Sequence, residues 1–285
     1  MREVFELVRL MEEVGGKVGD YVSPDVVDLG EGYDVVRVSC DNVDFVVIDK
    51  GGVELGDRLI GVDSHTSVLR FAAFDVHVVT GALVGRDVYL VPGVQGVRWL
   101  GGLKLRFRLD NADALDRYSG IIYVRSRYLG RYFDGSYNDE AIRDEVRLHV
   151  ELRLINIARE LSGFILIDGP VFPTPRILGM EGNEYSSLYW GGLVKDRVEA
   201  LRGGLRAVGV VKRLGQSHYL ARCLGGEVYA DDYTLAVNKL TPLLGNGGVA
   251  AIGPVRIEAG DYGKYCWYVA RGLVVGLTLL GLRGG

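Results

Sequence analysis

Cysteine is scarce in this chain of 285 residues, which has only Cys40, Cys223 and Cys266. The three are odd in number, far apart and in no spacing typical of metal ligands. This pattern argues against a cysteine-based metal site. It favours three small core residues in a protein of the reducing cytoplasm.

Long apolar runs are also absent. The longest, Gly272–Leu282, is too short and too often interrupted by glycine to span a bilayer. The first six residues carry acids where a signal peptide needs a basic segment followed by an apolar one. We therefore expect a cytoplasmic protein that is neither exported nor bound to a membrane.

An excess of positive charge is missing as well, because 33 Lys and Arg stand against 37 Asp and Glu, a net charge of −4. This balance argues against a protein that coats nucleic acid by bulk charge, but it allows a local basic track. A hydrophobic content of 48% and a charged content of 25% are ordinary for a globular protein. The length allows one elaborated domain or two small ones.

The most informative stretch spans residues 138–170, where a helix is followed at once by a strand. Apolar residues recur every three or four positions, as one face of a helix requires: Ile142, Val146, Val150, Leu154, Ile157 and Leu161. Ser162-Gly163 then ends the helix. The apolar run 164–167 predicts a buried strand that ends at Asp168-Gly169-Pro170.

Two carboxylates in this stretch have apolar neighbours. Glu151 projects from a second apolar row of the helix, and Asp168 closes the apolar strand. Such a carboxylate is costly unless it is paired, protonated or bound to metal. Glu151 could instead pair with Arg147, and Asp168 could be a plain turn residue. Two such acids converging on a third from elsewhere in the chain would indicate a metal site.

The order of the other expected elements predicts a mixed α/β sheet. Besides the helix and strand above, we expect helices over 1–20, 113–129, 188–205 and 231 to about 240. We expect a β-rich lead-in over 33–55 and strands over 59–62, 68–83, 87–92, 103–109 and 207–211. Residues 248–280 are expected to form two strands or a strand and a helix. No Gly-rich phosphate-binding fingerprint follows a strand. We predict a ribonuclease H-like mixed sheet with flanking helices, divided into a lead-in over 1–54 and a main domain over 55–285.

Acids on separate elements form the candidate metal-ligand set: Asp63 at the end of strand 59–62, Glu151, Asp168, and Asp231 or Asp232 at a helix start. Hard divalent ions prefer oxygen ligands, and two such ions can stabilise the attacking and leaving oxygens of phosphodiester cleavage. A turn-forming role is the alternative for Asp63. A phosphatase or sugar-kinase-like enzyme that uses Asp63 is a further alternative.

Basic and aromatic residues provide a candidate surface for single-stranded DNA, with phosphates on the bases and nucleobases stacked on rings. The candidates are Lys104, Arg106 and Arg108 on one strand face, Arg127, Tyr128 and Arg131 in a basic-aromatic run, and Lys212 and Arg213 after a strand. Lys212 is also a candidate for charge neutralisation at a scissile phosphate. An ordinary solvated face is the alternative for each group.

Four short motifs, in this order and spacing, resemble the NurA nucleases. Residues 61–64 (Gly-Val-Asp-Ser) resemble their first motif, and Glu151 followed by 164–170 resembles their second. Residues 208–213 resemble their Val-Gly-Val-x-Lys strand, and Asp231-Asp232 lies where a later acid is expected. The resemblance covers roughly residues 55–270.

The resemblance implies a ribonuclease H-like fold, a homodimer and a manganese-dependent DNA nuclease, with magnesium as the other candidate ion. It implies 5′–3′ exonuclease and single-strand endonuclease activity in DNA end resection, with a HerA-type hexameric ATPase translocase as partner. Carried over, the metal ligands would be Asp63, Glu151 and Asp168. Ser64 replaces the usual Gly, and the expected His-containing C-terminal segment is not found. A catalytically weak or silent dimeric scaffold is therefore the alternative.

Overall fold

The computed structural model describes residues 2–15, 36–48, 59–92, 101–107, 113–161, 163–172, 188–202, 206–215, 217–225, 231–244, 248–259, 261–271 and 274–281. The chain divides into two compact units. Unit 1 comprises Met1–Glu31, Val62–Glu160 and Glu181–Asp196, and unit 2 comprises Gly32–Gly61, Leu161–Met180 and Arg197–Gly285. The boundary predicted after residue 54 lies outside the described residues and stays a prediction.

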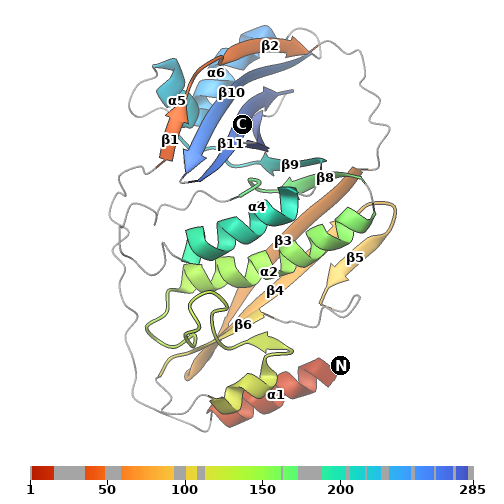
Figure 1. Cartoon of the computed structure of the whole chain (residues 1–285), viewed down its shortest axis with the longest axis vertical. Coiled ribbons are helices and arrows are strands. Elements are labelled where there is room, and N and C mark those ends of the chain that lie inside the picture. The colour runs from red at the N-terminus through yellow and green to blue at the C-terminus, as the bar shows by residue number, and fades with distance from the viewer. Residues whose placement is uncertain are drawn as a thin grey trace. The chain divides into compact units, whose positions relative to one another are not determined.

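Unit 1 is built on a mixed sheet (Figure 1). Its strands are β3 (Leu59–Arg70, within unit 1 from Val62), β4 (Phe74–Val84), β5 (Val88–Val91), β6 (Gly101–Leu105) and β7 (Ile122–Tyr123). Their order is β3-β4-β6-β7, with β5 also on β4. The pairs of β4 with β5 and with β6 are antiparallel, whereas β6 and β7 run parallel.

Helices cover both faces of this sheet. On one face, α2 (Asp139–Glu160) packs so closely that a Cβ on Gly81 would lie 2.5 Å from Val150 Cγ1. Alternate strand residues face the other side, where Leu10 of α1 (Arg2–Gly15) joins a core cluster with Phe74. The short 3₁₀ helix η1 spans Asp113–Tyr118, and the π-helix η3 spans Leu188–Val194.

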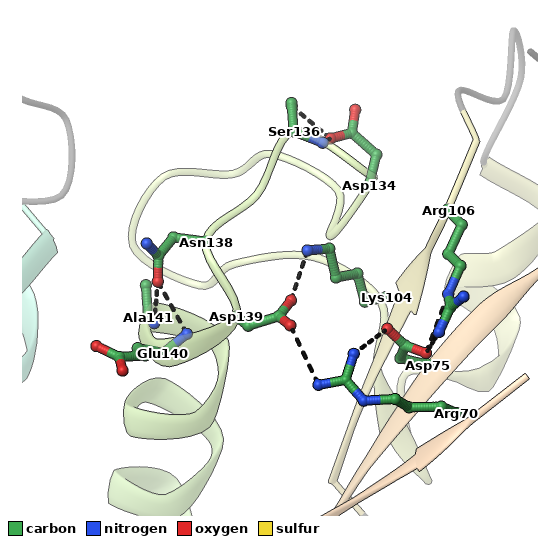
Figure 2. A network of polar contacts seen from close by, with 10 residues as sticks. All are labelled: Arg70, Asp75, Lys104, Arg106, Asp134, Ser136, Asn138, Asp139, Glu140 and Ala141. Carbon is green, nitrogen blue, oxygen red and sulfur yellow. Dashed lines mark hydrogen bonds and ion pairs between the residues drawn. The ribbon is translucent and has the colours of Figure 1, made fainter. Parts of the chain in front are cut away.

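The start of α2 follows from its cap. The side-chain oxygen of Asn138 accepts hydrogen bonds from the backbone N–H groups of Glu140 (2.8 Å) and Ala141 (3.1 Å), as Figure 2 shows. These bonds satisfy donors that the first turn of a helix otherwise leaves without partners. The observed helix agrees with the sequence prediction within a residue or two at each end.

In unit 2 the strands follow the order β1-β10-β11-β12-β9-β8, with β2 also on β10. Its strands are β1 (Val36–Ser39), β2 (Asp44–Ile48), β8 (Phe164–Asp168), β9 (Arg206–Val211), β10 (Val249–Ala259), β11 (Tyr262–Ala270) and β12 (Val274–Gly281). The strands β8 and β9 run parallel, and the other pairs are antiparallel.

The helices of unit 2 are α4 (Lys195–Arg202, within unit 2 from Arg197), α5 (Tyr219–Leu224) and α6 (Asp232–Leu240), followed by the 3₁₀ turn η4 (Thr241–Leu243). The helices α5 and α6 lie beside β10 (Figure 1). Their residues form one hydrophobic cluster with β10 and β11, including Leu220, Leu240, Ile252 and Tyr268. The prediction of a mixed α/β protein with flanking helices is thus confirmed, while its ribonuclease H-like topology stays a prediction.

Several element boundaries predicted from the sequence are wrong. Asp63 does not end a strand but lies inside β3, and the strand predicted over 68–83 is interrupted at residues 71–73. The helix predicted over 113–129 is the short η1 followed by β7, and the helix predicted over 188–205 begins as a π-helix. The tail holds three strands instead of two elements.

The cysteine expectation also needs correction. Cys40, which follows β1, and Cys223, in α5, form a disulfide across 183 residues of sequence. Only Cys266 is a free, buried core residue as expected. Among the described residues, no helix is long and apolar enough to cross a membrane.

Candidate functional site

Glu151 is a nearly buried carboxylate on the sheet-facing side of α2, with 7% of its surface exposed. The hydroxyl of Ser64, on β3, donates a short hydrogen bond to its Oε1. The Nε of Arg147 lies 3.7 Å from the same oxygen, one helical turn earlier. The ion pair between Glu151 and Arg147, which the sequence offered as an alternative to metal binding, is therefore present. Ser64 adds a contact that the sequence did not indicate.

Asp63 is exposed, although Ser64 beside it points inward. Its Oδ1 accepts a hydrogen bond from the backbone N–H of Ser64 at 2.7 Å. Successive side chains of a strand point to opposite faces. Asp63 therefore points away from the face on which Ser64 meets Glu151.

Asp168 and Lys212 meet at the carboxyl ends of two parallel strands in unit 2. Asp168 ends β8 and is paired in register with Val210 of β9. Lys212 follows β9, two residues after Val210, so its side chain lies on the same face as Asp168. Its ammonium donates to Asp168 Oδ2 at 2.7 Å. The sequence placed both residues among the candidates but gave no sign that they would contact each other.

Two glycines explain the local shape of this strand edge. Gly169 has a φ of +106°, which side chains with a Cβ rarely adopt, and it turns the chain directly after Asp168. A Cβ on Gly209 would lie 2.5 Å from both the carbonyl oxygen of Gly169 and the backbone nitrogen of Val171. The glycine of the Val-Gly-Val strand thus lets the turn after Asp168 pack against β9.

Asp231 and Asp232 are occupied by structural hydrogen bonds. Asp231 is the N-cap of α6, and its Oδ1 accepts from the backbone N–H of Thr234 at 2.7 Å. Asp232 is fully buried and accepts four hydrogen bonds, from Ser217 Oγ, Tyr219 N (3.0 Å), Ala221 N (3.0 Å) and Tyr268 Oη (2.7 Å). Protein donors thus surround Asp232, so we leave both acids out of the metal site proposed below.

The chemistry of the donors fits hard divalent ions, which bind carboxylate oxygens. Glu151 and Asp168 are carboxylates held beside a hydroxyl and a lysine, respectively. Within each unit, the described residues include no group of three His, Cys, Asp or Glu that could hold a metal ion. The assignment of Asp63, Glu151 and Asp168 to one metal site therefore stays a prediction.

Lys104 and Arg106 are engaged inside a network of charges in unit 1 (Figure 2). Lys104 is buried, and its ammonium contacts Asp139 Oδ1 at 2.5 Å. Arg106 contacts Asp75 at 2.6 Å, and Arg70 lies near both acids. Burial on its own would raise the pKa of Asp139, but the hydrogen bond and charge of Lys104, together with the charges of His77 and Arg70, outweigh burial and lower that pKa. Lys104 therefore points into the protein, and Arg108 lies outside the described residues. The DNA-binding role expected for this group of bases stays a prediction.

His77, which was not singled out from the sequence, is close enough to Asp139, Asp75 and Lys104 of this network for their charges to affect it. It is fully buried on β4, and neither ring nitrogen has a hydrogen-bond partner among the described residues. Burial lowers the pKa of His77 to about 4, although the nearby carboxylates of Asp139 and Asp75 oppose that shift. The ring is therefore neutral at pH 7.

The basic-aromatic run is partly structural. The ring of Tyr128 stacks on His149 at 5.8 Å, and its hydroxyl donates to Asp196 at 2.8 Å. Arg131 donates to Ser136 at 3.0 Å. Arg127 is exposed. Of this group, Arg127 is the side chain most accessible to a phosphate.

The mixed strand pairing within each unit, with helices packed against the strands, defines a mixed α/β protein. Residues 57–270 match the NurA domain, and the chain belongs to this family. That match includes every acid considered above. No curated protein matches the chain.

Three solved structures are similar to the chain. The NurA nuclease from Sulfolobus solfataricus is 12% identical, with a TM-score of 0.41 over 85% of this chain and 72% of that one. A second NurA structure is 11% identical, with a TM-score of 0.42 over 80% of this chain and 78% of that one. A structure of NurA with manganese is 11% identical, with a TM-score of 0.41 over 97% of this chain and 86% of that one.

Proposed function

We propose that this protein is a metal-dependent DNA nuclease. The observation that carries the proposal is membership of the NurA family over residues 57–270, which contain the candidate acids. Asp63, Glu151 and Asp168 would hold manganese, or magnesium, because these ions prefer carboxylate oxygens. When bound, such ions activate water and stabilise charge in phosphodiester hydrolysis.

The chain's own cations have separate roles in this proposal. Lys212, exposed beside Asp168, holds a phosphate oxygen close to the acid and neutralises charge that develops there. Arg213 and Arg127 are exposed and bind the sugar–phosphate backbone, which supplies affinity without sequence preference. Ser64 orients Glu151 by its hydrogen bond.

The biological setting is part of the proposal. We infer 5′–3′ exonuclease and single-strand endonuclease activity in end resection at double-strand breaks. The partner would be a hexameric ATPase translocase of the HerA type, and the protein would act as a homodimer. Membership of the NurA family supports this setting.

The test is degradation of end-labelled single- and double-stranded DNA by the purified protein with manganese, with magnesium and with EDTA. We expect cleavage with manganese and none with EDTA. Label released first from the 5′ end, with internal nicks in single strands, would support the two inferred activities. Cleavage that continues in EDTA would overturn the metal-dependent mechanism.

A catalytically silent scaffold is the second candidate, and one observation favours it. Glu151 of α2 lies on the face of β3 from which Ser64 projects, whereas Asp63 projects from the opposite face, so the structure does not bring these two candidate ligands together. A scaffold would capture the translocase in a pull-down but would bind no manganese in calorimetry. Manganese binding that is lost in Glu151→Gln would rule this candidate out.

A further inference from the structure

Residues 126–130, here called the Ser126 turn, lie between β7 and α2 in unit 1. The buried hydroxyl of Ser126 accepts hydrogen bonds from the backbone N–H groups of Tyr128 (3.2 Å) and Leu129 (3.0 Å). The N–H of Gly130, which has a φ of +67°, donates to the carbonyl oxygen of Ser126 at 3.0 Å. The backbone of the turn is therefore fixed by its own hydrogen bonds.

A buried carboxylate ties the Ser126 turn to α2. Glu145 is 1% exposed, and its Oε1 accepts a hydrogen bond from the backbone N–H of Arg127 at 2.6 Å. Its Oε2 has no hydrogen-bond partner among the described residues. A buried carboxylate with so few donors is costly. The fold therefore accepts a loss of stability at this position in order to hold the backbone of Arg127.

Tyr128 fixes the Ser126 turn at a second point. Its ring stacks on His149 at 5.8 Å, and its hydroxyl donates to Asp196 at 2.8 Å. The ring also packs so closely on Gly192 that a side chain there would collide with it. The backbone of Arg127 is thus held directly by Glu145 and through the next residue by Tyr128, while the side chain of Arg127 is exposed.

Arg127 is one of two cations near Tyr123 of β7. The other is Arg153 of α2, which is also exposed. Burial raises the pKa of Tyr123, and the charges of Arg127 and Arg153 oppose that shift, so both cations are close enough to act on this residue. The half-buried ring of Tyr123 stacks on His149 at 4.8 Å. Exposed cations beside a partly accessible ring suit the phosphates and bases of a single strand.

We propose that Glu145 is a positioning residue that holds Arg127 for contact with a phosphate of single-stranded DNA. An arginine on a fixed backbone loses less conformational freedom on binding than one on a mobile loop, so the same contact contributes more affinity. Glu145 does not touch the DNA and acts only through the backbone of Arg127. The identity of the ligand rests on the proposed nuclease function, whereas the link between Glu145 and Arg127 rests on their hydrogen bond.

The first test measures binding of fluorescein-labelled oligodeoxythymidine to the full chain by fluorescence anisotropy, in EDTA and at several salt concentrations. Arg127→Gln should weaken binding about threefold to tenfold and reduce the slope of log affinity against log salt by about 0.7, as loss of one phosphate contact does. Arg159→Gln is the matched control, because Arg159 is an exposed arginine in the last turn of α2, outside the Ser126 turn. Absence of binding by the wild type, or an equal loss in both variants, would overturn the proposal.

Two substitutions of Glu145 test the positioning role. Glu145→Ala and Glu145→Gln remove the same charge, but only glutamine keeps an acceptor oxygen for the N–H of Arg127. Glu145→Ala should therefore weaken binding and lower the salt slope as Arg127→Gln does, while Glu145→Gln should restore most of the affinity. Combining Glu145→Ala with Arg127→Gln should cause no further loss. Additive losses would show that Glu145 does not act through Arg127 and would overturn its positioning role.

A measurement on the unaltered protein covers the case in which Glu145→Ala does not fold. Phenylglyoxal modifies exposed arginines, and peptide mass identifies the modified residue. Saturating oligodeoxythymidine should slow modification of Arg127 and leave that of Arg159 unchanged. A rate at Arg127 that does not respond to the oligonucleotide would overturn the contact. None of these tests involves cleavage, so a chain that binds through Arg127 but cleaves no DNA would overturn the nuclease and keep this inference.

Discussion

Replacing each of the two neighbouring acids at the start of α6 by alanine should lower the stability of the protein by very different amounts. Asp231→Ala deletes an N-cap that faces solvent, whereas Asp232→Ala deletes a buried carboxylate with four donors around it. Both acids were candidate metal ligands from the sequence. The contacts instead make Asp231 a helix cap and Asp232 an anchor that ties α5 and β11 to α6.

The contacts also fix the size of the difference. Without the carboxylate, the backbone N–H groups of Tyr219 and Ala221 lose their acceptor and cannot turn to another. Each buried donor left without a partner costs about 1–3 kcal/mol, and two hydroxyls lose their acceptor as well, so we expect a loss of about 3–5 kcal/mol. Loss of the Asp231 cap should cost about 1 kcal/mol, because water reaches Thr234 N.

Urea unfolding in EDTA, followed by far-ultraviolet circular dichroism, measures both losses without any metal present. Asp232→Asn is a useful third variant, because it keeps the shape and one acceptor oxygen and should fall between the other two. A loss below about 1 kcal/mol in Asp232→Ala would contradict the anchor role. If manganese then stabilised the wild type but not this variant, Asp232 would be a metal ligand after all.

Three further perturbations address other parts of the molecule. Because the pKa of His77 falls from the usual 6.5 in the unfolded chain to about 4 in the fold, the unfolded state binds more protons between these values. The free energy of unfolding should therefore fall by at most about 3 kcal/mol as the pH drops from 6.5 to 4. In His77→Leu, the difference between the free energies of unfolding measured with urea at pH 7 and at pH 4.5 should be smaller by that contribution. Gly209→Ala should destabilise the protein by about 1–3 kcal/mol in the same assay, since its Cβ would meet backbone atoms at 2.5 Å; an unchanged midpoint would refute that packing. Ser64→Ala should lower nuclease activity less than Glu151→Gln does, because it removes a contact that orients the acid and leaves the acid in place; equal loss in both would contradict this order.

The sequence predicted best where a single periodic pattern dominates. The apolar stripe of α2 and the run that forms β8 each belong to one face of one element, so spacing alone locates them. The prediction that Asp63 ends a strand was wrong, because polar Ser64, His65 and Thr66 read as a turn. In the structure they continue β3, with Ser64 and Thr66 less exposed than Asp63 and His65.

Contacts between segments that are far apart in the chain could not be predicted from the sequence. The Cys40–Cys223 disulfide joins residues that no spacing rule connects. Lys104 belongs to an alternating strand pattern that predicts an exposed base, yet Asp139 from another element neutralises it in the interior. Local patterns therefore located the elements, while the partners of charged side chains depended on the tertiary fold.

The central claim, a carboxylate metal site that cleaves DNA, is tested most directly by measuring manganese binding and DNA cleavage on the same preparations. Wild type, Asp63→Ala, Glu151→Gln and Asp168→Asn would be compared, with Asp231→Ala as the matched acid control. The account predicts that the first three substitutions abolish cleavage and weaken manganese binding while Asp231→Ala retains both. Full cleavage by folded Asp63→Ala and Asp168→Asn proteins would contradict it.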